Sequence, residues 1–232
     1  MLLELDGVRF LTDPLLRTRV AHLRRAVPLT GPPPTADVVL ISHGHYDHLD
    51  LPSLRLLGSA PRVFVPRALV GRIPGPNVVG VEEGDERSVG AVTVRATYAD
   101  HDGGRPPFGG GAALGYALLG TKRVFFAGDT DLFDGMQGLV PDLDLALVPI
   151  WGWGPTLGRG KHMDPERAAE AVRRLAPRVA IPIHWGTYRP LHRRASSAFL
   201  TEPAEAFAQA AAAVAPDVEI RVLRPGEESL MA

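Results

Sequence analysis

The sequence predicts an α/β fold in which two β-sheets pack together and helices cover their outer faces. Runs typical of strands come first, helical segments are inserted between later runs, and the same mixture then repeats. Apolar residues make up 45% of the 232 residues, enough for a sizeable core. The length suits one large domain or two halves fused around one site. Because no linker or low-complexity tract divides the chain, we expect a single domain over residues 1–232.

Strands dominate the first part of the chain. Residues 1–5 and 8–12 flank Asp6-Gly7, a turn typical of hairpins, and the apolar run 37–41 predicts a buried central strand. A short helix is expected over residues 52–57 because proline favours the first helical turn. The segment 13–34 is expected to be irregular, and its arginines at the surface are Arg17, Arg19, Arg24 and Arg25. Further strands are predicted at residues 62–65, 78–81, 86–89 and 91–98.

The second part of the chain mixes strands with two longer helices. A hairpin is predicted over residues 114–119 and 122–127, and a buried strand over residues 143–150. Asp164 and Pro165 are typical of an N-cap and a first helical position, so a helix is expected to run from there to residue 175. The remaining predicted elements are strands at residues 179–183 and 218–223 and a helix at residues 203–214.

Composition narrows the classes of function. The net charge of −1 and the pI near 6.7 argue against a nucleic-acid partner. The chain has no cysteine, so it has neither a disulfide nor a thiolate nucleophile, and any metal site must use nitrogen and oxygen ligands. No apolar run approaches the roughly 18 residues of a transmembrane helix, and the first residues lack the features of a signal peptide. We therefore expect a cytoplasmic protein.

The most informative stretch is the loop that follows the predicted strand 37–41. Three histidines and one aspartate fall within six residues, namely His43, His45, Asp47 and His48. Clustered imidazoles repel one another when protonated and need partners when buried. A divalent metal ion supplies such a partner, because it binds neutral imidazole nitrogens and carboxylate oxygens. A solvated polar loop is the alternative explanation.

Four later residues also follow predicted strands or precede a helix at polar, glycine-rich turns. These are His101, Asp129, His184 and, less clearly, His162. Six of the eight histidines would then lie on one rim of the fold and, with the two aspartates, can supply two metal sites. Each also has a simpler explanation, as an exposed turn residue or a packed core histidine. His22 and His192 do not fit the pattern and are expected at the surface.

The order of these residues resembles the motif set of the metallo-β-lactamase superfamily. The likeness extends over nearly the whole chain, from Leu11-Thr12-Asp13-Pro14 through the histidine loop to Gly128-Asp129-Thr130. The segments 162–166 and 181–188 are similar to the branch that contains ascorbate-phosphate lactonases and N-acylphosphatidylethanolamine phospholipase D. The resemblance implies a four-layer αβ/βα sandwich, with two mixed sheets, outer helices and the site along one edge of the sheets.

The resemblance also implies a ligand set for two divalent metal ions. His43, His45 and His101 would hold one ion, and Asp47, His48 and His184 the other, with Asp129 bridging the two. Zinc is expected, and manganese or iron suits the same ligands. The implied reaction is hydrolysis by a metal-bridging hydroxide, with Asp47 orienting the hydroxide and His162 in a catalytic or substrate-facing role.

The substrate is less closely defined. A small-molecule or lipid-like, anionic phosphodiester or phosphorylated compound is the first expectation, and a lactone or ester is the alternative. A nuclease or a metal-binding scaffold without turnover is less favoured, and an oligomer is compatible with the sequence. Trp151 and Trp153 are candidate pocket residues, and residues 103–111 form a candidate lid. Candidate contacts to an anionic substrate are Arg105, Arg159 and Lys161.

Overall fold

A computed structural model describes residues 1–29, 31–58, 61–103, 111–151, 162–192 and 197–231. One sheet has five strands in the order β1-β2-β5-β6-β7. Its first two strands form the hairpin predicted around Asp6-Gly7, and the other neighbours are parallel. The strands are β1 (Leu2–Leu5), β2 (Val8–Thr12), β5 (Val38–Leu40), β6 (Arg62–Pro66) and β7 (Val78–Val81).

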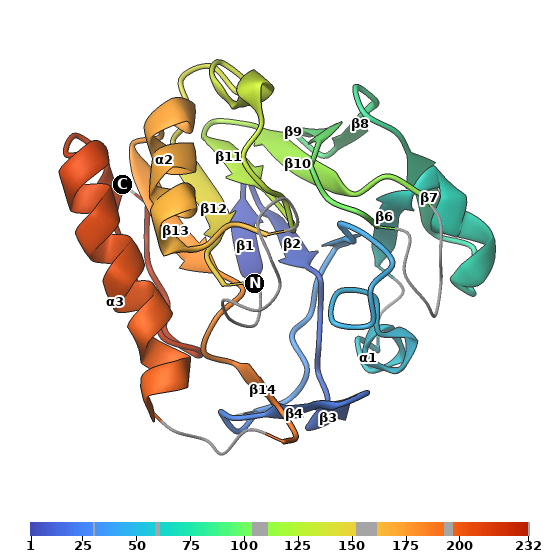
Figure 1. The fold of residues 1–232 in the computed structure, drawn as a ribbon. Helices are drawn as coiled ribbons and strands as arrows, with labels where there is room; N and C mark the ends of the chain where they lie inside the picture. The colour runs from blue at the N-terminus through green and yellow to red at the C-terminus, as the bar shows by residue number, and fades with distance from the viewer. Residues whose placement is uncertain (30, 59–60, 104–110, 152–161, 193–196, 232) are drawn as a thin grey trace.

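The second sheet has seven strands in the order β15-β13-β12-β11-β10-β9-β8 (Figure 1). Strands β8 to β11 pair antiparallel, and β11, β12, β13 and β15 pair in parallel, so this sheet is mixed. The strands are β8 (Glu86–Val89), β9 (Val92–Tyr98), β10 (Leu114–Leu119), β11 (Arg123–Phe126), β12 (Leu145–Pro149), β13 (Val179–Ile183) and β15 (Glu219–Ile220).

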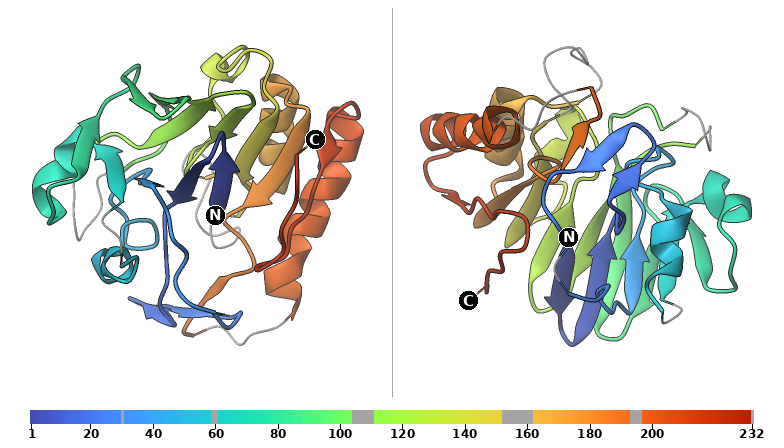
Figure 2. Two further views of the ribbon diagram at one scale, coloured as in Figure 1. Left: turned by 180° about the vertical axis from the view of Figure 1, so that it is seen from behind. Right: turned by 90° about the horizontal axis from the view of Figure 1, so that it is seen from below.

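Helices cover the outer face of each sheet, as the view from below in Figure 2 shows. Two long helices lie against the seven-stranded sheet, and the short helical segments near β6 and β7 lie on the far side of the five-stranded sheet. The helical elements are α1 (Leu51–Arg55), η1 (Arg67–Arg72), η2 (Asp134–Met136), α2 (Pro165–Leu175) and α3 (Ser197–Val214). This arrangement confirms the predicted four-layer sandwich.

Alternating side chains of the central strands create the separate cores between the layers. Val38 and Leu40 of β5 point into the core between the two sheets, whereas Val39 and Ile41 belong to the core beneath α1. The strand β12 alternates in the same way, with Leu147 between the sheets. Because both faces of these strands are buried, their sequence is continuously apolar rather than alternating.

Local sequence signals explain where α2 begins. Its N-cap Asp164 accepts a hydrogen bond from the backbone N–H of Arg167 at 2.9 Å, and Pro165 occupies the first helical turn. The predicted start of α3 at residue 203 was wrong, because the helix begins at Ser197 and contains Pro203. The residues before 203 include Phe199, whose ring packs against that of Trp151 with centroids 5.8 Å apart.

A third, small sheet was not predicted. It consists of β3 (Arg19–Val20), β4 (Leu23–Arg25) and β14 (Tyr188–Pro190) in the order β14-β4-β3. The irregular segment expected at residues 13–34 was therefore wrong for residues 19–25. Strands of two or three residues carry no readable alternation, and the partner strand lies far along the chain. Val20, Leu23 and Tyr188 form a small core of their own, to which Tyr46 adds.

Two of the arginines expected at the surface of this segment instead contact other parts of the protein. Arg17 is 39% exposed and makes a two-pronged ion pair with the buried Asp50, at 2.8 Å from Nε and 2.6 Å from Nη2. Arg25 is half-buried against the ring of Tyr188. Arg19 and Arg24 are exposed as expected. Within the described residues, no helix combines the length and apolar composition needed to cross a membrane.

Candidate metal centre

The predicted ligands come together at one edge of the sandwich because of the strand directions. The loop 42–48 leaves the end of β5, and His101 follows β9. Asp129 and His184 follow β11 and β13. Because β9, β11 and β13 run in the same direction, their carboxyl ends meet at this edge. The two sheets are joined there by a hydrogen bond from the Leu114 amide to the Ser42 carbonyl at 2.9 Å.

Gly128 allows the two sheets to approach each other at the site. Its φ is +62°, in the region that favours glycine, and an added Cβ would lie 2.6 Å from the Cβ of Ser42 and 2.9 Å from the carbonyl oxygen of Leu114. No side chain fits in that space. The absence of a Cβ therefore lets Asp129, the next residue, lie beside the histidine loop.

The first predicted ligand triad is assembled in space. One ligand atom each of His43, His45 and His101 lies within 4.8 Å of the others. The Nε2 atom of His101 is 3.3 Å from Nδ1 of His45. Two nitrogens bound at about 2.0–2.1 Å to one tetrahedral ion lie roughly 3.3 Å apart. The spacing of these two imidazoles is therefore that of two ligands sharing one ion.

The second triad is assembled beside the first. Ligand atoms of Asp47, His48 and His184 also lie within 4.8 Å of one another. The Oδ2 atom of Asp47 is 4.0 Å from Nε2 of His48 and 3.9 Å from Nε2 of His184. Both Nε2 atoms therefore face the same carboxylate, and the two imidazole rings stack with centroids 5.2 Å apart.

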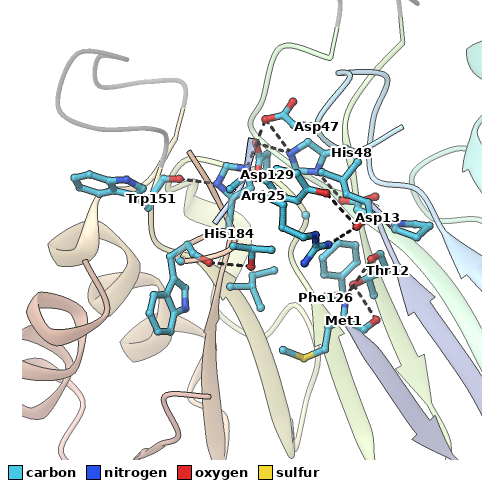
Figure 3. Close-up of a pocket in the computed structure, with 18 of the residues that line it drawn as sticks. Met1, Thr12, Asp13, Arg25, Asp47, His48, Phe126, Asp129, Trp151 and His184 are labelled. Atoms are coloured by element: carbon cyan, nitrogen blue, oxygen red, sulfur yellow. Dashed lines mark hydrogen bonds and ion pairs between the residues drawn. The ribbon is translucent and has the colours of Figure 1, made fainter. Parts of the chain in front are cut away.

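Asp129 lies close to ligands of both triads, and Figure 3 shows it beside His48 and His184 of the second. Its carboxylate is 3.1 Å from Nε2 of His48, 3.5 Å from Nε2 of His184 and 3.3 Å from Nδ1 of His162. A carboxylate oxygen of Asp129 also lies within 4.8 Å of ligand atoms of His43 and His48, and the same holds for His101 and His162. Each of these two groups of three residues could hold a metal ion. Its 1% exposure leaves little access for solvent. This is the position that a bridging ligand requires.

The chemistry of the donor atoms fits divalent cations. In the described part of the chain, five buried polar atoms at this centre have no partner in hydrogen-bonding geometry. They are Nε2 of His43, His45 and His48 and both carboxylate oxygens of Asp129. Unpaired buried polar atoms are costly, each by about 1–3 kcal/mol, so their concentration in one place requires a partner. Cations bound between the two triads would give that partner to Nε2 of His43 and His48 and to the Asp129 carboxylate, with His45 ligating through Nδ1.

Two outer contacts orient the imidazoles of the second triad. The Nδ1 atom of His48 lies 2.7 Å from Oδ2 of Asp13, and that of His184 lies 2.6 Å from the carbonyl oxygen of Trp151. Nδ1–H donating in both pairs directs Nε2 of each ring toward the centre, where it can ligate a metal ion. Asp13 is itself held by the amide and hydroxyl of Ser42, at 2.8 and 2.6 Å.

The role of Asp13 was missed from the sequence, although the stretch 11–14 was part of the resemblance. The available signal was its position directly after a strand of the same sheet as the histidine loop. Its φ of +38° is unusual for a residue other than glycine or asparagine, so the surrounding structure holds it in place.

Burial and neighbouring charge set the protonation of the metal-free centre. Burial lowers the pKa of His43 well below its usual value and that of His45 to about 4, so both are neutral and able to ligate. Burial also disfavours charge on His48, but Asp129 and Asp13 outweigh it and raise the pKa of His48 well above its usual value. Burial opposes ionisation of Asp129 too, yet His184 and His48 hold its pKa well below the usual range. A metal ion must therefore displace a proton from His48.

The other sequence-predicted residues divide into three groups. His162 joins the cluster, with its ring 4.8 Å from that of His101. His22 and His192 are exposed, as expected, although His22 contacts the hydroxyl of Tyr46 at 3.1 Å. Outside the described residues lie Arg105, Trp153, Arg159, Lys161 and most of the stretch 103–111.

A cavity of about 290 Å³ lies beside the second triad (Figure 3). Asp47, His48, Asp129 and His184 line one part of it, and Trp151 is also in its wall. The rest is mostly apolar, with walls that include Leu11, Leu15, Phe126, Ile183 and Phe199. Arg25 supplies a cationic side chain to the same wall.

Comparisons with known proteins find relatives over most of the chain. The family model described as beta-lactamase superfamily domain matches residues 8–185. A protein of Methanopyrus kandleri named UPF0173 metal-dependent hydrolase is 32% identical, over 97% of this chain and 93% of its own length. The N-acyl-phosphatidylethanolamine-hydrolyzing phospholipase D 1 of Caenorhabditis elegans is 29% identical over 81% of this chain. The match spans only 62% of that relative's length.

Solved structures share the architecture. The structure of Igni18, described as a metallo hydrolase from the archaeon Ignicoccus hospitalis, aligns with a TM-score of 0.70 and 25% sequence identity. The alignment covers 97% of this chain and 91% of that one. The similarity therefore extends over both sheets and the edge at which the histidines and aspartates meet.

Proposed function

Because the chain belongs to the beta-lactamase superfamily, among its metal-dependent hydrolases, we propose that it hydrolyses a phosphodiester or phosphorylated substrate at a dinuclear centre. The observation that carries this proposal is the pair of ligand triads on either side of Asp129, whose buried carboxylate has no partner in hydrogen-bonding geometry among the described residues. The proposed ligands are the seven residues expected from the sequence, namely His43, His45, Asp47, His48, His101, Asp129 and His184.

Two divalent cations held there would supply an activated water near neutral pH and Lewis-acid polarisation of the scissile group. The protein's own contribution is orientation. Asp13 and the Trp151 carbonyl fix the imidazoles of His48 and His184, so these ligands need no rearrangement when the centre is loaded. The buried setting excludes bulk water and strengthens the electrostatic interactions of the site.

Asp47 is proposed both as a ligand and as the group that orients the attacking water. Its side chain is 11% exposed and lines the cavity, so one carboxylate oxygen can face a substrate while the other faces the second triad. A carboxylate in this position accepts a hydrogen bond from water and aligns it with the bond to be broken.

The apolar cavity and the phospholipase relative support a phosphodiester with an apolar body. A lactone or other carboxylic ester is the second candidate, because the apolar walls suit an acyl group equally well. A net charge of −1 provides no attraction for RNA, so a nuclease is not favoured. Zinc is the proposed metal, with manganese and iron as alternatives, and the cytoplasm is the proposed location.

A substrate panel tests this function. Metal content is measured on the purified protein, and hydrolysis of bis(p-nitrophenyl) phosphate, p-nitrophenyl phosphate and an acyl lactone is followed after loading with each metal. We expect two metal equivalents per chain and the fastest turnover with the diester, abolished by a chelator. Turnover of the lactone alone would select the second candidate. Full metal loading without turnover on a broader ester panel would indicate a scaffold.

Replacing His162 by alanine separates a substrate-facing role from a ligand role. Its Nδ1 atom contacts Asp129, but the two proposed ion positions are complete without it. We expect the His162→Ala variant to keep two metal equivalents and to lose about 10²–10⁴-fold in kcat, the range for general acid–base groups. His192→Ala, at an exposed position, is the matched control. A kcat equal to that of the control would remove His162 from the site, and loss of metal would make it a ligand.

A further inference from the structure

Arg25 presents a positive charge to the cavity without a matching carboxylate. Its Nη2 atom donates to the carbonyl oxygen of Leu15 at 2.5 Å, and its guanidinium carbon lies 4.8 Å from the centroid of the Tyr188 ring. Its Nε atom is buried and has no hydrogen-bond partner within the ranges that the structure describes. Among the described residues, no carboxylate lies within ion-pair distance of Arg25. The guanidinium is therefore held in place by neutral groups.

The carboxylates that share the cavity with Arg25 are engaged elsewhere. Asp13 accepts hydrogen bonds from Ser42 and contacts His48, and Asp129 is surrounded by imidazoles. A partly buried cation in apolar surroundings is costly unless an anion accompanies it. Because no carboxylate in the described part of the chain pairs with Arg25, the cavity is suited to a ligand that brings an anion.

Backbone pairing in the small sheet fixes the position of Arg25 relative to the metal centre. In the pairing of β4 with β14, Arg25 lies opposite Tyr188, and the backbone N–H of Arg25 donates to the carbonyl of Thr18 at 2.9 Å. The Tyr188 hydroxyl donates to the carbonyl of Arg17 at 2.6 Å. Since Tyr188 follows His184 by only four residues, one short segment carries both a proposed ligand and the support of Arg25.

We propose that Arg25 binds a phosphoryl oxygen of the substrate and so selects amphiphilic phosphodiesters whose apolar part lies against the cavity wall. Figure 3 shows the side chain of Arg25 extending into the cavity that His48 and Asp129 also line. A guanidinium pairs well with phosphate because its N–H groups match two oxygens at once. This inference rests on the proposed function, for which it names the class of substrate.

The inference is tested with phenylphosphonate, an anion with an apolar ring that the enzyme cannot hydrolyse as an ester. Its binding is measured by calorimetry on the metal-loaded and metal-free protein, together with kcat and KM for bis(p-nitrophenyl) phosphate. The variants are Arg25→Met, which suits the apolar wall, and Arg25→Lys, which keeps the charge. Arg24→Met is the matched control, because Arg24 is exposed on the same strand.

We expect Arg25→Met to bind phenylphosphonate about 10–100-fold more weakly, the loss of one or two charge-assisted hydrogen bonds. KM for the diester should rise by a similar factor, KM for a neutral ester should change by a much smaller factor, and Arg25→Lys should recover part of the binding. The control should match the wild type. Unchanged phosphonate affinity and KM in Arg25→Met would overturn the inference.

Two further outcomes are distinguishable. In the first, the wild type hydrolyses no phosphodiester but binds phenylphosphonate, and Arg25→Met weakens this binding. That result would contradict the proposed reaction and still support an anion-binding role for Arg25. If Arg25→Met does not fold, Arg25→Gln takes its place in the same measurements. Failure of both variants to fold, as judged by thermal unfolding, would make Arg25 a structural residue and overturn the inference.

Discussion

The Asp129→Ala variant is expected to lose bound metal and activity together while keeping its fold. Asp129 is in contact with His48, His162 and His184, and its two oxygens are the donors placed between both ligand triads. We expect at most one tightly bound metal equivalent per chain. Turnover should fall by more than about a hundredfold, the upper end for loss of an outer-shell partner of a metal site. Elemental analysis and steady-state kinetics measure the two effects.

Asp131 provides the control for this substitution. It is as buried as Asp129 and only two residues away, but its carboxylate pairs with Arg167 of α2. Asp131→Asn should lower the thermal unfolding midpoint and leave the metal stoichiometry at two. A variant of Asp129 that retained two metal equivalents and the full rate would show that this carboxylate does not bridge.

The Gly128→Ala variant is expected to disrupt the centre without changing any ligand. A Cβ at this position would meet the Cβ of Ser42 at 2.6 Å, and the backbone there has a φ of +62°. The left-handed conformation alone costs about 1–2 kcal/mol for a residue with a side chain. Relief of the clash requires the end of β11 to move away from the histidine loop, so Asp129 would be displaced. We expect lower stability, weaker metal binding and loss of most activity.

Gly138 separates these two effects. Its φ is +72°, but an added Cβ would meet no atom within 4 Å. Gly138→Ala should therefore show the conformational cost alone, with normal metal content. Chemical unfolding of both variants and metal titration measure the difference. Equal stability losses and equal metal affinities in the two variants would contradict a role for Gly128 in closing the site.

Much of the fold was predictable because local patterns and tertiary packing agree. The continuous apolar runs around β5 and β12 indicated buried strands, and Asp164 with Pro165 indicated the start of α2. The small sheet was not predictable, because its strands have two or three residues and β14 lies more than 160 residues after β4. Its formation depends on packing around Leu23 and Tyr188 rather than on local preference.

By itself, the sequence determined which residues are available as ligands and at which strand ends they lie, because histidine and aspartate in turns are visible in any chain. Only the tertiary structure decided how close Asp129 lies to His48, His162 and His184 and that Asp13 contacts His48. The same holds for Arg25, which shares a cavity with the metal centre. These relations depend on strand direction and on close approach at Gly128, which arise only when both sheets pack.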